Sequence, residues 1–290
     1  MKLVLTLKCP TLQSAKFMED KRGYSHISLK PTIRVQTDFD IPSQNDVEPP
    51  EFAKVQAEDY KKSKKLSDEY GKDLILVFER NLIYAFDFFY NSKKIFIPEL
   101  NPVTIFYSNA IMSKKRLDDF KLKLLEESPS LKDMDKNPDL KLFGDFFQLA
   151  SNCIFNLQGA LESFANIIIP PDYSFIDKNG DVINRPSLSH KLFNTIPKIK
   201  EKEFKKHCRR GKFVVENIIK MRNNIVHLKP TKEQTNTKFK NPYRRLIKYN
   251  FSDAIKMARE YINFYEPNLI EDCNCGKEYF FDIIVSQKNQ

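Results

Sequence analysis

The sequence predicts a mainly helical α+β protein, with a β-containing N-terminal part followed by a C-terminal helical bundle. Near residues 27–35, apolar and polar residues alternate, which is typical of half-buried strands. In the second half of the chain, apolar residues recur at steps of three and four, which is typical of helices that bury a wide face. The chain has 290 residues, of which 41% are hydrophobic and 24 are Phe, so it can build one large core or two ordinary ones.

Residues 1–137 are expected to form an N-terminal α+β domain of unassigned role. Within it, residues 73–108 are rich in aromatic and β-branched residues, and their pattern fits strand and helix equally. The other expected elements are strands at 2–8, 27–29 and 33–35, a linker at 41–50, and helices near 51–70 and 114–127. Proline-containing segments at 128–130 and 137–139 mark the boundary with the next domain.

Residues 138–272 are expected to form the helical domain. The long helices predicted in it run over about 146–169, 207–228 and 252–265. Pro230 closes the second helix because proline lacks an amide donor and disfavours helical geometry in the residue before it. Residues 273–290 are expected to form a C-terminal strand or tail, in which the apolar residues 279–285 can pair with the N-terminal strands.

Positive charge is concentrated in one segment of the chain. The formal net charge is +10, but residues 198–248 hold 17 Lys and Arg against four Glu, a net +13, so the rest of the chain is net −3. Such a segment attracts a polyanion, and salt weakens the attraction. A nucleic-acid ligand and a solvated basic face without a ligand both fit this charge. The seven Gly form no phosphate-binding loop signature, which argues against nucleotide binding through such loops.

Other patterns exclude several classes of protein. No run of about 18 apolar residues occurs, and the apolar run at residues 1–8 is too short for a secretion signal. We therefore expect a cytoplasmic protein without a membrane partner. The five Cys are scattered, which fits a reducing compartment. Cys273 and Cys275 alone are too few to hold zinc, and no His pair has metal-ligand spacing, so no metal and no cofactor are expected.

Three polar residues gather near the end of the second predicted helix: Arg222, Asn223 and His227. At about 100° per residue, Asn223 and His227 lie on one face, opposite an apolar row, and Arg222 lies at the edge of that face. A guanidinium offers a planar fork of donors to phosphate, and an imidazole exchanges protons near neutral pH. The same residue types are also common at helix ends as structural groups, so their spacing alone leaves both interpretations open.

The pattern Arg222-Asn223-x-x-x-His227 resembles the signature of the HEPN superfamily, in which an Arg, an adjacent polar residue and a His follow one another in this order. Residues 158–166 are also similar to the first long helix of such domains. The resemblance covers about residues 140–270. It implies a helical bundle that commonly dimerises through facing motif helices, and many members of the superfamily are ribonucleases of defence or toxin systems.

Carried over to this sequence, the resemblance implies that His227 transfers protons, Arg222 holds the scissile phosphate and Asn223 orients His227 or the substrate. Glu162 is a further catalytic candidate, matched only by its position in the earlier helix. Attack by a ribose 2′-OH needs one proton removed and another delivered, so a homodimer with two imidazoles would form a composite site. RNA supplies this nucleophile itself, so the cleavage needs no metal. The expected function is a metal-independent endoribonuclease in phage defence (abortive infection) or a toxin system, restrained by an antitoxin or sensor partner.

Basic and aromatic residues around the motif add candidate RNA contacts. They are Lys220, Tyr243, Arg244, Arg245, Lys248 and Tyr249. Such side chains can clamp the backbone of single-stranded RNA and stack on its bases. In an equally good interpretation, the Tyr rings pack on the helical bundle and the basic residues form a loop above them. For the whole chain, the alternatives are a non-catalytic HEPN-like module that binds RNA or dimerises, and a scaffold that binds only protein.

Overall fold

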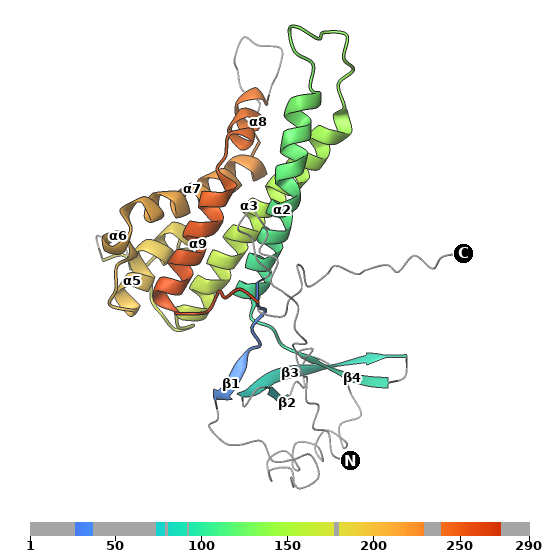
Figure 1. Ribbon diagram of the computed structural model, residues 1–290. Coiled ribbons are helices and arrows are strands. Elements are labelled where there is room, and N and C mark those ends of the chain that lie inside the picture. The colour runs from blue at the N-terminus through green and yellow to red at the C-terminus, as the bar shows by residue number, and fades with distance from the viewer. Residues whose placement is uncertain are drawn as a thin grey trace. The chain divides into compact units, whose positions relative to one another are not determined.

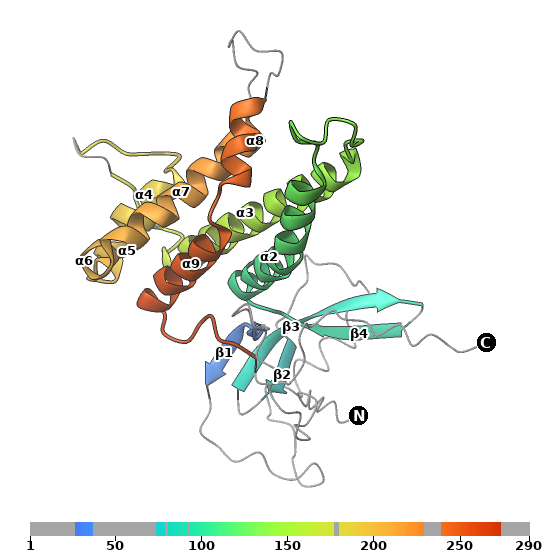
Figure 2. The same cartoon turned by 45° about the horizontal axis from the view of Figure 1, so that its top comes forward.

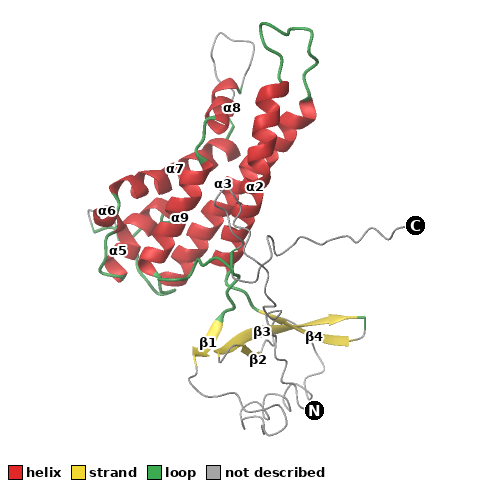
Figure 3. Ribbon diagram, viewed as in Figure 1, coloured by secondary structure: helices red, strands yellow, loops and turns green. Residues whose placement is uncertain are grey.

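The computed structural model describes residues 27–36, 74–78, 81–91, 93–176, 180–228 and 239–273. These residues form helices and a small antiparallel sheet, which confirms the mainly helical α+β expectation (Figures 1 and 3). They divide into two compact units, one within residues 29–101 and one within residues 102–273 together with Ile27 and Ser28. Four expected elements lie outside the described residues: the strand at 2–8, the linker at 41–50, the helix at 51–70 and the strand at 279–285.

β3 (Asn81–Tyr90) is the central strand of the sheet, and the other strands pair with it antiparallel. They are β1 (Ile33–Gln36), β2 (Leu74–Phe78) and β4 (Lys93–Pro98). Asn91 turns the chain between β3 and β4 with a φ of 47°, a left-handed conformation in which Asn is several-fold enriched. In the segment 73–108, whose pattern fits strand and helix equally, the described residues up to Pro98 therefore form strands.

The helical unit begins earlier than expected. α2 (Pro102–Glu127) starts with Pro102, where a missing backbone amide costs no helical hydrogen bond, and it packs along α3 (Leu140–Ile168). The domain boundary expected after residue 137 is therefore wrong, because α2 belongs to the same compact unit as α3. The strand expected at 27–29 is also absent, since Ile27 makes an isolated antiparallel bridge with Asp272.

α3 is the central helix of the core, as its apolar row predicts. Asp139 caps it by accepting hydrogen bonds from the backbone amides of Lys141 and Leu142. Every member of the predicted row is buried: Phe146, Ala150, Cys153, Leu157, Ala160 and Phe164. α9 (Phe251–Tyr265) forms where it was expected and packs against α3. Both long helices thus follow directly from the period of their apolar residues.

α7 (Arg209–Val226) packs against α3 and α9, and the three helices lie side by side in both Figure 1 and Figure 2. An ion pair of 2.8 Å between Arg210 and Asp253 links α7 to α9. The start of α7 also approaches α6 (Phe204–His207) closely, because Gly211 has no side chain. A Cβ atom at Gly211 would lie 2.8 Å from ring atoms of Phe204, so a larger residue would push the two helices apart.

Several short helices were not predicted. α4 (Leu188–His190), the π-helical segment η2 (Lys191–Thr195) and α5 (Ile196–Ile199) follow one another without a break. α8 (Lys240–Ile247) forms in the basic stretch after the motif, for which no helix was predicted. In the part of the chain that the structure describes, no helix combines the length and apolar character needed to cross a membrane.

Candidate functional site

The last turns of α7 carry the motif, and the apolar face of the helix fixes their orientation. The residues that bury this face are Val215, Ile218, Met221 and Ile225. Because they belong to the core of the helical unit, the opposite face of α7 points to solvent. Lys220 and Asn223 lie on this opposite face and are exposed. The helix ends at Val226, two residues before the predicted end.

Arg222 and Asn223 interact directly. Nη1 of Arg222 donates a hydrogen bond to Oδ1 of Asn223 over 3.2 Å. His227 follows as the C-cap of α7, with φ −108° and ψ 48°, and its backbone N–H donates to the carbonyl oxygen of Asn223 over 2.9 Å. The imidazole is exposed. The three residues thus lie within about one and a half turns at the end of α7. Arg222 and Asn223 are joined by a side-chain hydrogen bond, and the imidazole of His227 is exposed to solvent.

Glu162 does not join this cluster. It is exposed on α3, and no hydrogen bond or ion pair connects it to the three motif residues within the described chain. α8, which contacts α7, packs near the other end of α3, where Tyr243 meets Phe147. Fifteen residues separate Phe147 from Glu162, which is about 22 Å along a helix axis. The resemblance-based assignment of Glu162 to the site therefore gains no geometric support.

Exposed cations lie on α7 and α8 beside the motif in the sequence. They are Lys220, Arg244, Arg245 and Lys248. None of them forms an ion pair with another described residue, in contrast to Arg210, which pairs with Asp253. Unpaired, solvent-exposed cations are available for phosphate groups. On this criterion all four remain candidate RNA contacts, and all four lie on or beside a helix.

The two tyrosines are packed on the bundle. The ring centroid of Tyr243 lies 5.1 Å from that of Phe143 and 5.6 Å from that of Phe147. Tyr249 is only 7% exposed and contacts Phe251 edge-on at 5.0 Å. Burial raises the pKa of Tyr249, and its hydroxyl has no hydrogen-bond partner among the described residues. The expectation that Tyr249 stacks on RNA bases is therefore wrong, because its ring is inside the core.

Cys153 is a core residue and not a nucleophile. Its side chain is fully buried, and this burial raises the pKa of the thiol to about 12, although the positive charge of Lys114 partly opposes the shift. Such a thiol is almost entirely protonated at neutral pH and reacts poorly. Within the described ranges, no group of three or more His, Cys, Asp or Glu side chains is placed to hold a metal ion.

A second group of candidate binding residues was not predicted. Lys198, Lys202 and Lys205 line a cavity that lies at the N-terminal end of α7. The high density of lysines after residue 197 is the signal for it in the sequence. Sequence alone does not separate this signal from the charge around the motif, since the walls of the cavity come from helices too short to produce a readable period.

Comparison with known proteins identifies no relative: no family model matches the chain, and neither a curated protein nor a solved structure does.

Proposed function

We propose that the chain is a metal-independent endoribonuclease of HEPN type that acts in the cytoplasm, in phage defence by abortive infection or as a toxin. One observation carries the proposal: Arg222 and Asn223 are hydrogen-bonded to each other next to an exposed His227, all on the last turns of a firmly packed helix. Burial of one face of α7 fixes the helix from which these side chains extend, and catalysis requires such a rigid support.

In this mechanism, a 2′-oxygen of RNA attacks the adjacent phosphorus atom and the bond to the 5′-oxygen breaks. One imidazole removes the proton of the 2′-OH, and a second, protonated imidazole donates a proton to the departing 5′-oxygen. The products are a 2′,3′-cyclic phosphate and a 5′-hydroxyl. Arg222 binds the phosphate oxygens, on which negative charge grows in the transition state. Asn223 holds the guanidinium through the observed hydrogen bond.

The reaction needs two imidazoles, and each chain supplies one His227. We therefore propose a homodimer in which two α7 helices face each other. The exposed side of α7 supports this arrangement, because Phe213 is 63% exposed on it. Phe213, Lys220 and His227 are spaced by seven residues, so they form one stripe along this side. Burial of the Phe213 ring would favour contact between two copies.

The decisive experiment incubates purified protein with single-stranded RNA in EDTA. We expect cleavage that leaves cyclic phosphates, and a loss of about 10²-fold or more in rate for His227→Ala. His207→Ala is the matched control, because His207 is also exposed but lies before α7 and stacks on Phe264. Substrate with 2′-deoxyribose at the cleaved position should remain intact. Equal activity of the His227→Ala and His207→Ala variants would remove His227 from the mechanism.

A separate measurement tests the dimer. Phe213→Ser should shift the protein to a monomer in light scattering and lower the cleavage rate with it. Leu122→Ser is the matched control, since Leu122 is similarly exposed, at 58%, but lies on α2. A dimer that survives Phe213→Ser unchanged would contradict an α7-mediated interface.

The second candidate function is a non-catalytic module that binds RNA. The exposed, unpaired cations of α8 and the residue after it favour it, because phosphate binding by Arg244, Arg245 and Lys248 needs no proton transfer. Salt-sensitive RNA binding that persists in His227→Ala, without cleavage by either protein, would establish this alternative. An antitoxin or sensor protein that restrains the activity fits either function.

A further inference from the structure

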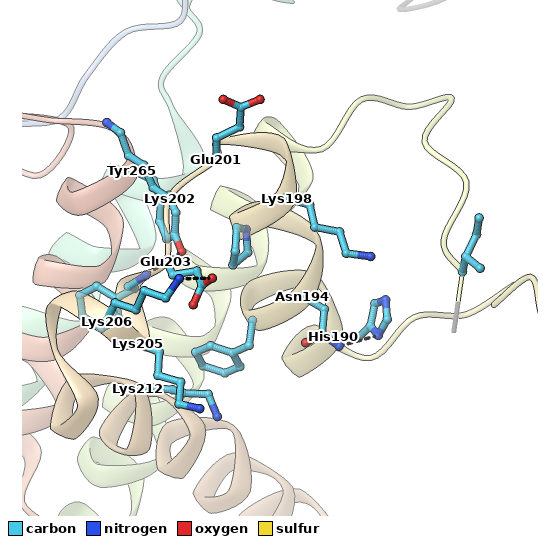
Figure 4. A pocket seen from close by; sticks show the side chains of 14 residues that line it. His190, Asn194, Lys198, Glu201, Lys202, Glu203, Lys205, Lys206, Lys212 and Tyr265 are labelled. Carbon is cyan, nitrogen blue, oxygen red and sulfur yellow. Dashed lines mark hydrogen bonds and ion pairs between the residues drawn. The ribbon is translucent and has the colours of Figure 1, made fainter. Parts of the chain in front are cut away.

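A cavity of about 850 Å³ lies in the helical unit, at the opposite end of α7 from the motif (Figure 4). Its walls come from α4 to α6, from Lys212 in the first turn of α7 and from Tyr265 of α9. Lys212 precedes Asn223 by eleven residues, or about 16 Å along the helix axis. The volume lies within the range of roughly 300–1,000 Å³ that is usual for small-molecule sites. The proposed nuclease mechanism uses none of these residues.

Positive charge dominates the lining of the cavity. Five lysines and two glutamates line it, so its formal charge is +3 before counting His190. Two of the lysines are neutralised: Lys206 pairs with Glu203 at 2.8 Å, and Lys212 pairs with Glu216 at 2.7 Å. The other three are exposed and form no ion pair with any residue that the structure describes; they are Lys198, Lys202 and Lys205. Glu201, the other carboxylate of the lining, is also exposed and forms no ion pair with a described residue, so the unpaired groups carry a net charge of +2, which attracts an anion.

One wall adds neutral hydrogen-bond donors. His190, Asn194 and Lys198 are spaced by four residues along α4, η2 and α5, and in Figure 4 His190 and Lys198 extend to the same side. Nδ2 of Asn194 lies 3.1 Å from Nδ1 of His190. The amide nitrogen can only donate, so Nδ1 of His190 accepts and its Nε2–H remains a donor. Donors and cations on one wall suit an anion with several oxygens.

We propose that this cavity binds a small ligand through a chain of two or more phosphate groups. A polyphosphate chain supplies many acceptor oxygens and enough negative charge to neutralise the three unpaired lysines. Lysine ammonium groups bind phosphate as point charges and do not require the planar geometry of arginine. Half-buried Phe193, over which Lys212 lies at 5.1 Å from the ring centroid, gives the cavity an apolar wall for the rest of the ligand. This site is separate from the proposed nuclease site and does not depend on it.

Titration calorimetry on the full chain in low salt tests the proposal with tripolyphosphate, ATP and adenosine as separate ligands. We expect one site for tripolyphosphate, for ATP or for both, and no binding of adenosine. Tighter binding of ATP would identify a nucleotide as the source of the phosphate chain, and equal binding would identify the polyphosphate alone. The His227→Ala variant should bind these ligands as tightly as the unchanged protein does. Failure of the nuclease proposal would therefore leave this prediction unaffected.

The critical variant is Lys198→Glu with Lys205→Glu, which should weaken binding at least tenfold. Lys123→Glu with Lys132→Glu is the matched control, because it changes the net charge equally at exposed positions of α2 and the following loop. All four lysines are exposed, so neither variant should lower the melting temperature by more than a few degrees. Absence of binding by the unchanged protein, or an equal loss in both double variants, would overturn the proposal. A third result would also overturn it: the protein binds a short RNA but neither phosphate ligand, and only Lys198→Glu with Lys205→Glu abolishes the RNA binding.

Discussion

Nη1 of Arg222 and Oδ1 of Asn223 are 3.2 Å apart, so neighbouring residues of α7 share a hydrogen bond between their side chains. The bond restricts the guanidinium, which otherwise loses much rotational freedom when it binds a ligand. An arginine has five N–H donors, so the remaining ones are still available for a phosphate. The imidazole of His227, five residues after Arg222, is exposed, and these three residues form the nuclease site that we propose.

Arg222→Lys should lower the rate of RNA cleavage by about 10- to 100-fold, although the positive charge is kept. A lysine offers neither the planar fork to the phosphate nor the geometry of the bond to Asn223. Single-turnover cleavage assays measure the effect, with Lys123→Arg as the reverse exchange at an exposed position of α2, for which we expect an unchanged rate. Full activity of Arg222→Lys would show that charge alone is sufficient.

Removal of the cations of α8 and its following residue should weaken RNA binding and its salt dependence together. If Arg244, Arg245 and Lys248 each contact one phosphate, their replacement by Ala lowers the slope of log K against log salt by about 2. Filter binding at several salt concentrations measures this slope. Alanine at Lys123, Lys132 and Lys136, which are exposed on α2 and the following loop, should leave it unchanged. Similar slopes for both triple variants would exclude α8 from the RNA interface.

Loss of the hydroxyl group should change the free energy of unfolding differently at two buried tyrosines. The hydroxyl of Tyr249 has no hydrogen-bond partner among the described residues, so Tyr249→Phe should leave the free energy of unfolding unchanged or raise it by about 1 kcal/mol. The hydroxyl of Tyr107 donates to the carbonyl oxygen of Ile255 over 2.9 Å and links α2 to α9. Tyr107→Phe should therefore lower the free energy by about 1 kcal/mol. Urea unfolding measures both, and equal losses would contradict this assignment.

The raised pKa of Cys153 predicts a stability that falls at alkaline pH. The thiol ionises near 9.0 in the unfolded chain but only near 12 in the folded protein, so the unfolded state loses its proton first and is favoured as pH rises above 9. The stability difference between the unchanged protein and Cys153→Ala should shrink by about 2 kcal/mol between pH 8 and pH 10.5. Unfolding in urea at the two pH values measures it. A difference that stays constant would show that the thiol ionises equally in both states.

Two glycines should respond oppositely to alanine. Gly144 lies in α3, and a Cβ atom at this position would meet nothing within 4 Å, so Gly144→Ala should stabilise the fold by about 1 kcal/mol through helix propensity. At Gly211 the new methyl group would meet the Phe204 ring at 2.8 Å, so Gly211→Ala should destabilise it by about 1–3 kcal/mol. Thermal unfolding measures both changes. Stabilisation by Gly211→Ala would show that α6 moves aside without cost.

The sequence predicts the long helices well because their apolar rows leave few alternatives. α7 and α9 form close to their predicted bounds, and the row from Phe146 to Phe164 of α3 is buried in full. α3 begins at Leu140, six residues before its predicted start. The same pattern also predicts that Asn223 and His227 lie on the face of α7 opposite the core. For these helices the spacing of apolar residues agrees with the tertiary packing, so the spacing alone is sufficient to predict the helix and its buried face.

Other features depend on contacts that local sequence does not encode. The start of α2 is one of them, because the aromatic and β-branched residues after Pro102 fit a strand until α3 provides a helix to pack against. α5 and α8 are too short for periodicity to reveal. Tyr249 follows Lys248 in a basic stretch that predicts a surface position, yet its ring is buried because it packs against Phe251.

α7 runs without interruption from Arg209 to Val226, about 27 Å at 1.5 Å per residue. Its first turn borders the lysine-rich cavity through Lys212, and its last turn leads into His227. A continuous helix of this length moves largely as one rigid element, so a tilt at one end displaces the other end. If the proposed lysine-rich site and the proposed nuclease site both exist, a ligand that moves the first turn of α7 also moves His227, so its binding would be measured as a change in RNA cleavage.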